Sequence, residues 1–166
     1  VWFTGFGLSL APILFAQYTC QVWATDLSTI AVQHLQQHQR ICWEDTFHEW
    51  KEFLTTFQLE PPTFPPLTLK VQQADFCKYT PELPIDLILN SRSLLCLSPV
   101  LQERALQHFF EVLSDHGTLI LECYSPPPKE LYEHVRNIGF ELSSLKHDSH
   151  RKTCWIKSIL PKILPG

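Results

Sequence analysis

The decisive stretch of this sequence is Val1-Trp-Phe-Thr-Gly5-Phe-Gly7-Leu-Ser9, an apolar run that breaks into glycines. A helix-like segment follows it, and a second apolar run then ends at Asp26. A strand, a glycine turn, a helix and a second strand that ends in a carboxylate form a βαβ unit that can hold a nucleoside. The pattern therefore predicts a chain that binds a nucleotide-type cofactor.

Two glycines and one carboxylate carry this prediction. Gly5 and Gly7 let a ligand approach the backbone because they lack a Cβ, and they tolerate the positive φ angles of a tight turn. Asp26 lies about twenty residues downstream, where a carboxylate at the tip of the second strand can accept hydrogen bonds from both hydroxyls of a ribose. The alternative is that Asp26 only supports the N-terminus of the next helix, beside Ser28.

Length, charge and cysteine pattern narrow the class of protein. The 166 residues, 45% of them hydrophobic, suit a single domain over residues 1–166. The net charge is −4 and no run of Lys or Arg forms a basic stripe, so nucleic acid is not an expected partner. The apolar segment over residues 1–16 is too short to span a bilayer, and no membrane partner is expected. Six scattered cysteines show no metal-ligand spacing and suit a cytoplasmic protein without a metal: Cys20, Cys42, Cys77, Cys96, Cys123 and Cys154.

The rest of the chain alternates strand and helix patterns. Further strands are expected at Gln21–Thr25, Leu67–Val71, Ile85–Leu89, Thr118–Cys123, Phe140–Lys146 and Thr153–Ile159. Helices are expected at Leu10–Tyr18, Thr29–Arg40, Trp43–Phe57, Pro99 to about Leu113, and Lys129–Asn137. Ser98 is expected to be the N-cap of the helix that begins at Pro99, and Gly139 is expected to end the last helix.

These patterns predict an α/β fold with a Rossmann-like, seven-stranded and mostly parallel sheet, helices on both faces and an antiparallel C-terminal hairpin. An inserted helix and a Pro-rich connection are expected at about 41–66. The segment Asp115-His-Gly117 is expected to close its helix with a left-handed glycine.

The order of five short motifs resembles the class I S-adenosylmethionine-dependent methyltransferases. The motifs are Gly5-Phe-Gly7-Leu-Ser9, Thr25-Asp26-Leu27-Ser28, Ala74-Asp75-Phe76, Ile85-Asp86-Leu87-Ile88 and Leu113-Ser-Asp-His-Gly117. Within that family, the segment 86–124 looks most like the thiopurine methyltransferase-like branch. The proline-capped stretch Leu94-Leu-Cys-Leu-Ser-Pro99 and Arg104 in the following helix carry this second resemblance.

The resemblance implies S-adenosylmethionine as cofactor and a small molecule as methyl acceptor. It implies that Asp26 holds the ribose, that Asp75 and Phe76 flank the adenine, and that Asn90 faces the methyl donor and acceptor. The cofactor-binding residues are thus expected to be Gly5, Gly7, Asp26, Leu27, Asp75, Phe76 and Asn90, and no catalytic residue is assigned. The alternatives are that Asp75 is a turn residue and that Asn90 caps a loop.

Three departures from the family pattern support a different function. Phe3 stands where the family has an acidic residue, Ser9 replaces the third glycine, and the covering helix of the family is expected to be missing before Val1. A degenerate, non-catalytic domain that acts as an interaction or scaffold module is therefore the alternative. A nicotinamide-dependent oxidoreductase is a third hypothesis from the βαβ unit alone, which the C-terminal hairpin disfavours.

Overall fold

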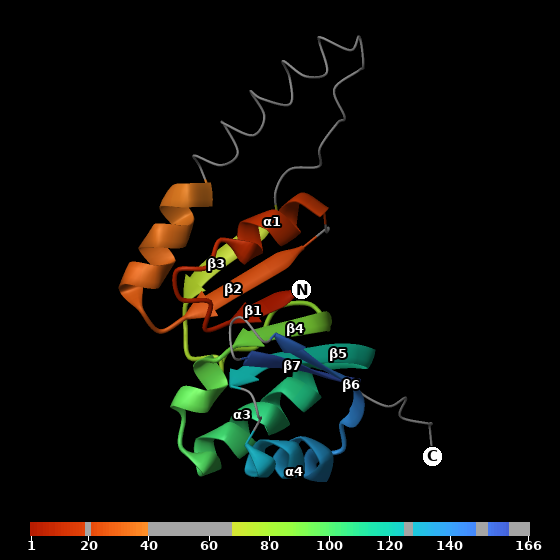
Figure 1. The fold of residues 1–166 in the computed structure, drawn as a ribbon. Coiled ribbons are helices and arrows are strands. Elements are labelled where there is room, and N and C mark those ends of the chain that lie inside the picture. The colour runs from red at the N-terminus through yellow and green to blue at the C-terminus, as the bar shows by residue number, and fades with distance from the viewer. Residues whose placement is uncertain (19–20, 40–67, 125–127, 149–152, 160–166) are drawn as a thin grey trace.

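A computed structural model describes residues 1–18, 21–39, 68–124, 128–148 and 153–159. Within these residues seven strands form one sheet in the order β3-β2-β1-β4-β5-β7-β6 (Figure 1). The strands are β1 Trp2–Thr4, β2 Val22–Asp26, β3 Leu69–Gln73, β4 Ile85–Ser91, β5 Leu113–Tyr124, β6 Glu141–Asp148 and β7 Thr153–Ile159. The inserted helix at Trp43–Phe57 and the Pro-rich connection lie outside the described residues.

The pairing of the strands confirms the predicted sheet. β1 pairs in parallel with β2 and β4, and the parallel pairing continues to β3 on one side and β5 on the other. β7 runs antiparallel between β5 and β6, which gives the C-terminal hairpin. The order of the strands thus reverses between β1 and β4.

Helices cover both faces of the sheet (Figure 1). On one face lie α1, Ala11–Tyr18, and a helical segment over residues 29–39; on the other lie α3, Pro99–Val112, and α4, Lys129–Ile138. Successive strand residues point to opposite faces, so Trp2 packs in the core on the side of α3 while Phe3 packs in the core on the side of α1. None of the helices in the described part of the chain has the length and apolar character needed to cross a membrane.

Several helix ends follow the expected signals and one does not. Ser98 occupies the N-cap position of α3 without a side-chain hydrogen bond to the helix, Pro99 is the first helical residue, and α4 ends at Gly139 with φ 113°. The prediction that a left-handed Gly117 closes α3 is wrong. β5 begins at Leu113 directly after α3, and the positive φ of 63° belongs to His116. A Cβ on Gly117 would lie 2.7 Å from the carbonyl oxygen of Ser114, so the glycine allows a close approach of the backbone.

Candidate functional site

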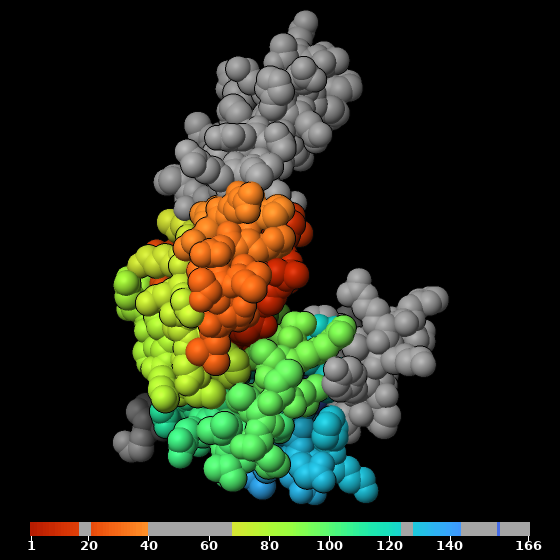
Figure 2. All heavy atoms as spheres, turned by 90° about the vertical axis from the view of Figure 1, so that its left-hand side faces the viewer, coloured from red at the N-terminus to blue at the C-terminus, as the bar shows by residue number. Residues whose placement is uncertain are grey.

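The carboxyl ends of β1, β2, β3 and β4 meet at one edge of the sheet. This edge lies at the left of Figure 1 and faces the viewer in Figure 2, where the segments after these strands lie side by side. Ligands of open α/β sheets bind in the crevice outside the carboxyl ends of the strands, at the point where the strand order reverses. All seven residues that the sequence predicts as cofactor-binding lie at or directly after these strand ends.

The two glycines after β1 serve different purposes. Both have left-handed backbone conformations, with φ +62° at Gly5 and φ +56° at Gly7. The N–H of Gly5 donates to the carbonyl oxygen of Thr25 at 2.8 Å, and a Cβ on Gly5 would lie 2.3 Å from the Cβ of Ser93. A Cβ on Gly7 would meet nothing within 4 Å. Gly5 therefore allows close packing, whereas the space beside Gly7 is open to a ligand.

Asp26, at the end of β2, connects the glycine turn to the next helix. Its Oδ2 accepts the N–H of Gly7 and its Oδ1 accepts the N–H of Ser28, both at 2.8 Å. The Oγ of Ser28 in turn accepts the N–H of Ala31 at 3.3 Å, as expected of an N-cap. The helix-supporting role of Asp26 is thus present. A carboxylate has about four acceptor positions, so two of them remain for hydroxyl groups of a ligand.

Three apolar side chains lie exposed around this carboxylate. Leu8 follows Gly7, Leu27 follows Asp26 and Ile30 lies in the first turn of the helix; their exposed fractions are 64%, 63% and 74%. The carbonyl oxygen of Leu27 accepts a hydrogen bond from Gln73 at the end of β3, at 3.0 Å, which fixes the loop after β2. Exposed leucines beside a polar anchor can contact the flat face of a base.

In the loop after β3, Asp75 is half-buried whereas Phe76 is buried in the core. Asp75 is half-buried and its Oδ1 accepts the N–H of Cys77 at 2.9 Å, so it has the turn role that the sequence also allows. Phe76 is only 6% exposed, and its ring lies 5.8 Å from that of Phe109 of α3 at a tilt of 35°. A Cβ on Gly5 would lie 3.5 Å from the Phe76 ring, so the two residues are close neighbours. Burial and the Asp75 carboxylate raise the pKa of the Cys77 thiol to about 11, which keeps it protonated.

Asn90, at the end of β4, lies inside the fold and not at its surface. The side chain is 1% exposed, and its Nδ2 donates to the Oγ1 of Thr4 and the Oγ of Ser93, each at 2.8 Å. Its Oδ1 accepts the N–H of Leu94 at 3.0 Å, in the 3-10 helix η1, Ser93–Cys96. The expectation that Asn90 faces the methyl donor and acceptor is corrected here, because its burial and its bonds give it the role of joining β1, β4 and η1.

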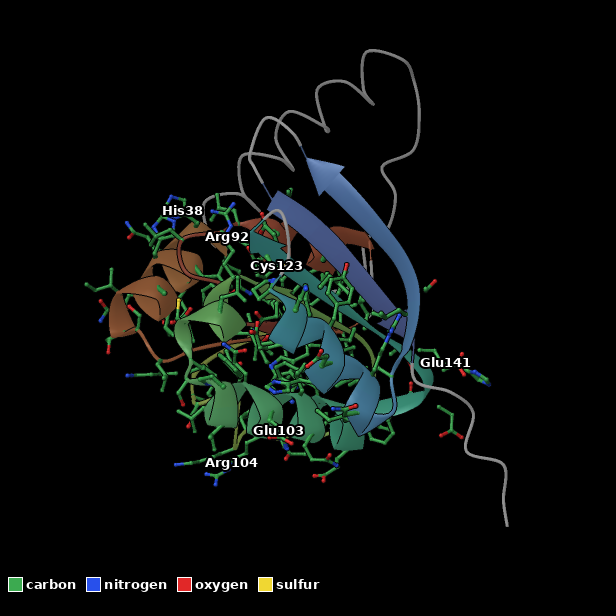
Figure 3. The ribbon with its side chains drawn as sticks, turned by 60° about the horizontal axis from the view of Figure 1, so that its bottom comes forward. His38, Arg92, Glu103, Arg104, Cys123 and Glu141 are labelled. Atoms are coloured by element: carbon green, nitrogen blue, oxygen red, sulfur yellow. The ribbon has the colours of Figure 1, made fainter. Side chains whose placement is uncertain are left out.

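An ion pair between a half-exposed arginine and a buried glutamate lies at the same edge and was not predicted from the sequence. Arg92 has a left-handed backbone with φ 63°, and its Nη2 donates to the Oε1 of Glu122 at 2.9 Å. Glu122, in β5, is 5% exposed, and its other oxygen accepts a hydrogen bond from the hydroxyl of Ser91. Figure 3 shows Arg92 near Cys123 of β5, with Glu103 and Arg104 far away on α3. A charged residue in the apolar run of β5 was the only sequence signal for this pair.

The residues of this edge fit the nucleoside end of S-adenosylmethionine. At this edge, the unused acceptor positions of Asp26 lie next to the open space at Gly7 and the exposed side chain of Leu27. Phe3 stands where the family has an acidic residue. It is 7% exposed and packs edge-on against Phe15 with ring centroids 5.1 Å apart, so this position would offer no carboxylate to the amino-acid end of the cofactor.

Of the comparisons with known proteins, the one with solved structures identifies the fold. No protein-family model matches the sequence, and a search of the curated proteins finds no match. Among solved structures, the glycopeptide N-methyltransferase MtfA in complex with S-adenosyl-L-homocysteine matches with a TM-score of 0.71 at 11% identity, over 96% of this chain and 80% of that chain. The N-methyltransferase NodS from Bradyrhizobium japonicum, also with S-adenosyl-L-homocysteine, matches with a TM-score of 0.70 at 10% identity, over 97% and 77% of the two chains.

The chain therefore has the fold of the class I S-adenosylmethionine-dependent methyltransferases. The similarity does not single out the thiopurine methyltransferase-like branch, which stays a prediction. The [4+2]-cyclase SpnF also matches, with a TM-score of 0.66 at 13% identity over 97% of this chain and 75% of that chain. Because one fold hosts several reactions, the function has to be argued from the site.

Proposed function

We propose that this chain binds S-adenosylmethionine at the carboxyl edge of its sheet and transfers the methyl group to a small-molecule acceptor. The observation that carries the proposal is the carboxylate of Asp26, which two backbone N–H groups hold at the tip of β2 beside the open space at Gly7. A fixed carboxylate at this point of the fold suits a pair of ribose hydroxyls.

The chain supplies the binding groups from three loops. Asp26 accepts hydrogen bonds from the ribose, and Leu8 and Leu27 offer exposed apolar surface to the base. Asp75 lies after the neighbouring strand, and its Oδ2 is 3.9 Å from the ammonium of Lys78, so it can still accept a bond from an adenine amino group. Phe76 offers little surface to a ligand, because it is 6% exposed and its ring lies in the core.

Catalysis in this proposal consists of positioning. The bound cofactor supplies a methyl group that is already electrophilic. The chain has to align the acceptor and exclude water, and it needs a base only for an acceptor that arrives protonated. Arg92 is the charged side chain best placed to meet an acceptor, since its side chain is 43% exposed at this edge and Glu122 holds it in place.

We also infer a cytoplasmic location. The support is the spacing of the six cysteines, which shows neither a disulfide framework nor a metal site, together with the free thiols of Cys77 and Cys96.

Calorimetric titration with S-adenosylhomocysteine tests the proposal. Asp26→Asn should weaken binding about 10- to 100-fold, because each charge-assisted hydrogen bond contributes roughly 1.5–3 kcal/mol. Asp86→Asn is the matched control: Asp86 is exposed at the start of β4 and its Oδ1 accepts a bond from Ser114, far from the proposed site. Thermal melts of both variants confirm folding. Absence of binding by the folded wild-type chain would refute the proposal and favour a scaffold module.

A further inference from the structure

A hollow of about 180 Å³ lies at the opposite edge of the sheet. It is formed by the start of β2, the start of β3 and the loop before β4, and its lining residues are Gln21, Val22, Trp23, Thr68, Lys70, Glu82 and Leu83. Val22 and Asp26 are the two ends of β2, about 13 Å apart at the usual rise of a strand. This hollow is therefore separate from the nucleoside site.

One residue that lines the hollow, Trp23, has a buried donor to which the described residues offer no acceptor. Trp23 is 4% exposed, and its indole N–H makes no hydrogen bond within the described residues. Trp2, its neighbour across β1 and β2, instead donates its indole N–H to the Oγ1 of Thr25 at 3.0 Å. An unpaired buried donor is destabilising, and such groups are rare unless water or a ligand supplies an acceptor.

Two opposite charges form the rim of the hollow. Lys70 lies opposite Trp23 in the register of β2 and β3, and its ammonium lies 5.9 Å from the centroid of the indole ring. The same ammonium pairs with the carboxylate of Glu82. The side chains of this ion pair are 54% and 71% exposed, so separating the two charges costs little.

The rim charges decide which ligand suits the hollow. A simple anion that takes the place of Glu82 on Lys70 leaves the Glu82 carboxylate unpaired, and a simple cation leaves Lys70 unpaired. A zwitterion satisfies both, with its carboxylate on Lys70 and its ammonium on Glu82. A carboxylate on Lys70 would also lie close to the indole ring of Trp23, because the Lys70 ammonium is 5.9 Å from the ring centroid.

We propose that the hollow between Trp23, Lys70 and Glu82 is a binding site for a small zwitterion of the α-amino-acid type. The site is independent of the proposed methyl transfer, because it shares no residue with the carboxyl edge of the sheet.

Nitrogen-15 NMR of the five tryptophan indole N–H groups tests the site in the full chain, with glycine as the probe. Trp23→Phe assigns the Trp23 signal. Glycine should shift this signal saturably while the Trp2 signal stays in place, because the Trp2 N–H already has its acceptor. Sodium acetate and methylammonium chloride at equal ionic strength should bind at least tenfold more weakly than glycine.

Two conservative variants separate the roles of the rim charges. Lys70→Gln should weaken glycine binding at least tenfold, and Glu82→Gln should abolish the preference for glycine over acetate. Lys129→Gln, an exposed lysine of α4, is the matched control and should bind glycine as the wild type does. The proposal is overturned if glycine gives no saturable Trp23 shift, which assigns the N–H to water, or if acetate binds as well as glycine.

Discussion

Alanine at each of the two glycines after β1 should separate stability from binding. Any side chain in the left-handed region costs about 1–2 kcal/mol, and both glycines have φ near +60°. Alanine at Gly5 also places its Cβ 2.3 Å from both the Cβ and the Oγ of Ser93, and such overpacking adds about 1–3 kcal/mol. We expect Gly5→Ala to lower the free energy of unfolding by about 2–5 kcal/mol and Gly7→Ala by about 1–2 kcal/mol.

Binding should change in the opposite order. The methyl group of Gly7→Ala points into the open space beside Asp26, where the nucleoside is proposed to lie, and it leaves the Gly7 N–H bond to Asp26 intact. This variant should therefore fold and bind S-adenosylhomocysteine at least tenfold more weakly than the wild type, as measured by calorimetry.

Urea unfolding followed by tryptophan fluorescence measures the stability part of the prediction. The double variant Gly5→Ala with Ser93→Gly removes both atoms that the new methyl group meets, so the pair should show a coupling of about 1–3 kcal/mol. Equal losses of stability at Gly5 and Gly7, or strictly additive effects in the double variant, would refute the reasoning.

Two further predictions concern the ion pair and the thiols. Arg92→Ala should lower the free energy of unfolding by about 1–3 kcal/mol because it leaves the buried Glu122 without its cation, whereas Glu122→Gln should cost less because Arg92 reaches water. Urea unfolding gives the order, and the reverse order contradicts it. With a pKa of about 11, the Cys77 thiol is about one part in a thousand thiolate at pH 8, so iodoacetamide should label the exposed Cys96 first and Cys77 only as the pH approaches 11. Equal labelling rates at pH 8, read by mass spectrometry, would contradict the second prediction.

The elements that the sequence predicts well are those with local signals. Ser98-Pro99 begins α3 and Gly139 ends α4 as expected, because caps depend on residues within one helical turn. The start of β5 was not predicted because the residues that follow Leu113 are polar. Its extension to Leu113 depends on pairing with Ile85 of β4, which no local pattern reveals.

The residues of the candidate site also fall into two groups, those that local sequence motifs predict and those that depend on contacts between distant parts of the chain. Gly7 and Asp26 are visible in the sequence because a glycine turn and a strand-end carboxylate are both local motifs. The burial of Asn90 depends on Thr4, 86 residues away, and so follows only from the assembled sheet. The Arg92–Glu122 pair spans 30 residues, and only the charge in the apolar run of β5 hints at it.

The two ends of the proposed site differ in the number of polar atoms that are free to bind a ligand. This difference determines which residues can contribute to the affinity. At the nucleoside end, Asp26 keeps unused acceptor positions next to open space at Gly7. Next to Gly5, the side chains of Ser93 and Asn90 are packed together. Their polar atoms form hydrogen bonds with each other and with Thr4. Binding energy in the described residues is therefore concentrated at Asp26. A change at this one carboxylate tests the proposed cofactor more directly than restoring a carboxylate at the buried Phe3 would.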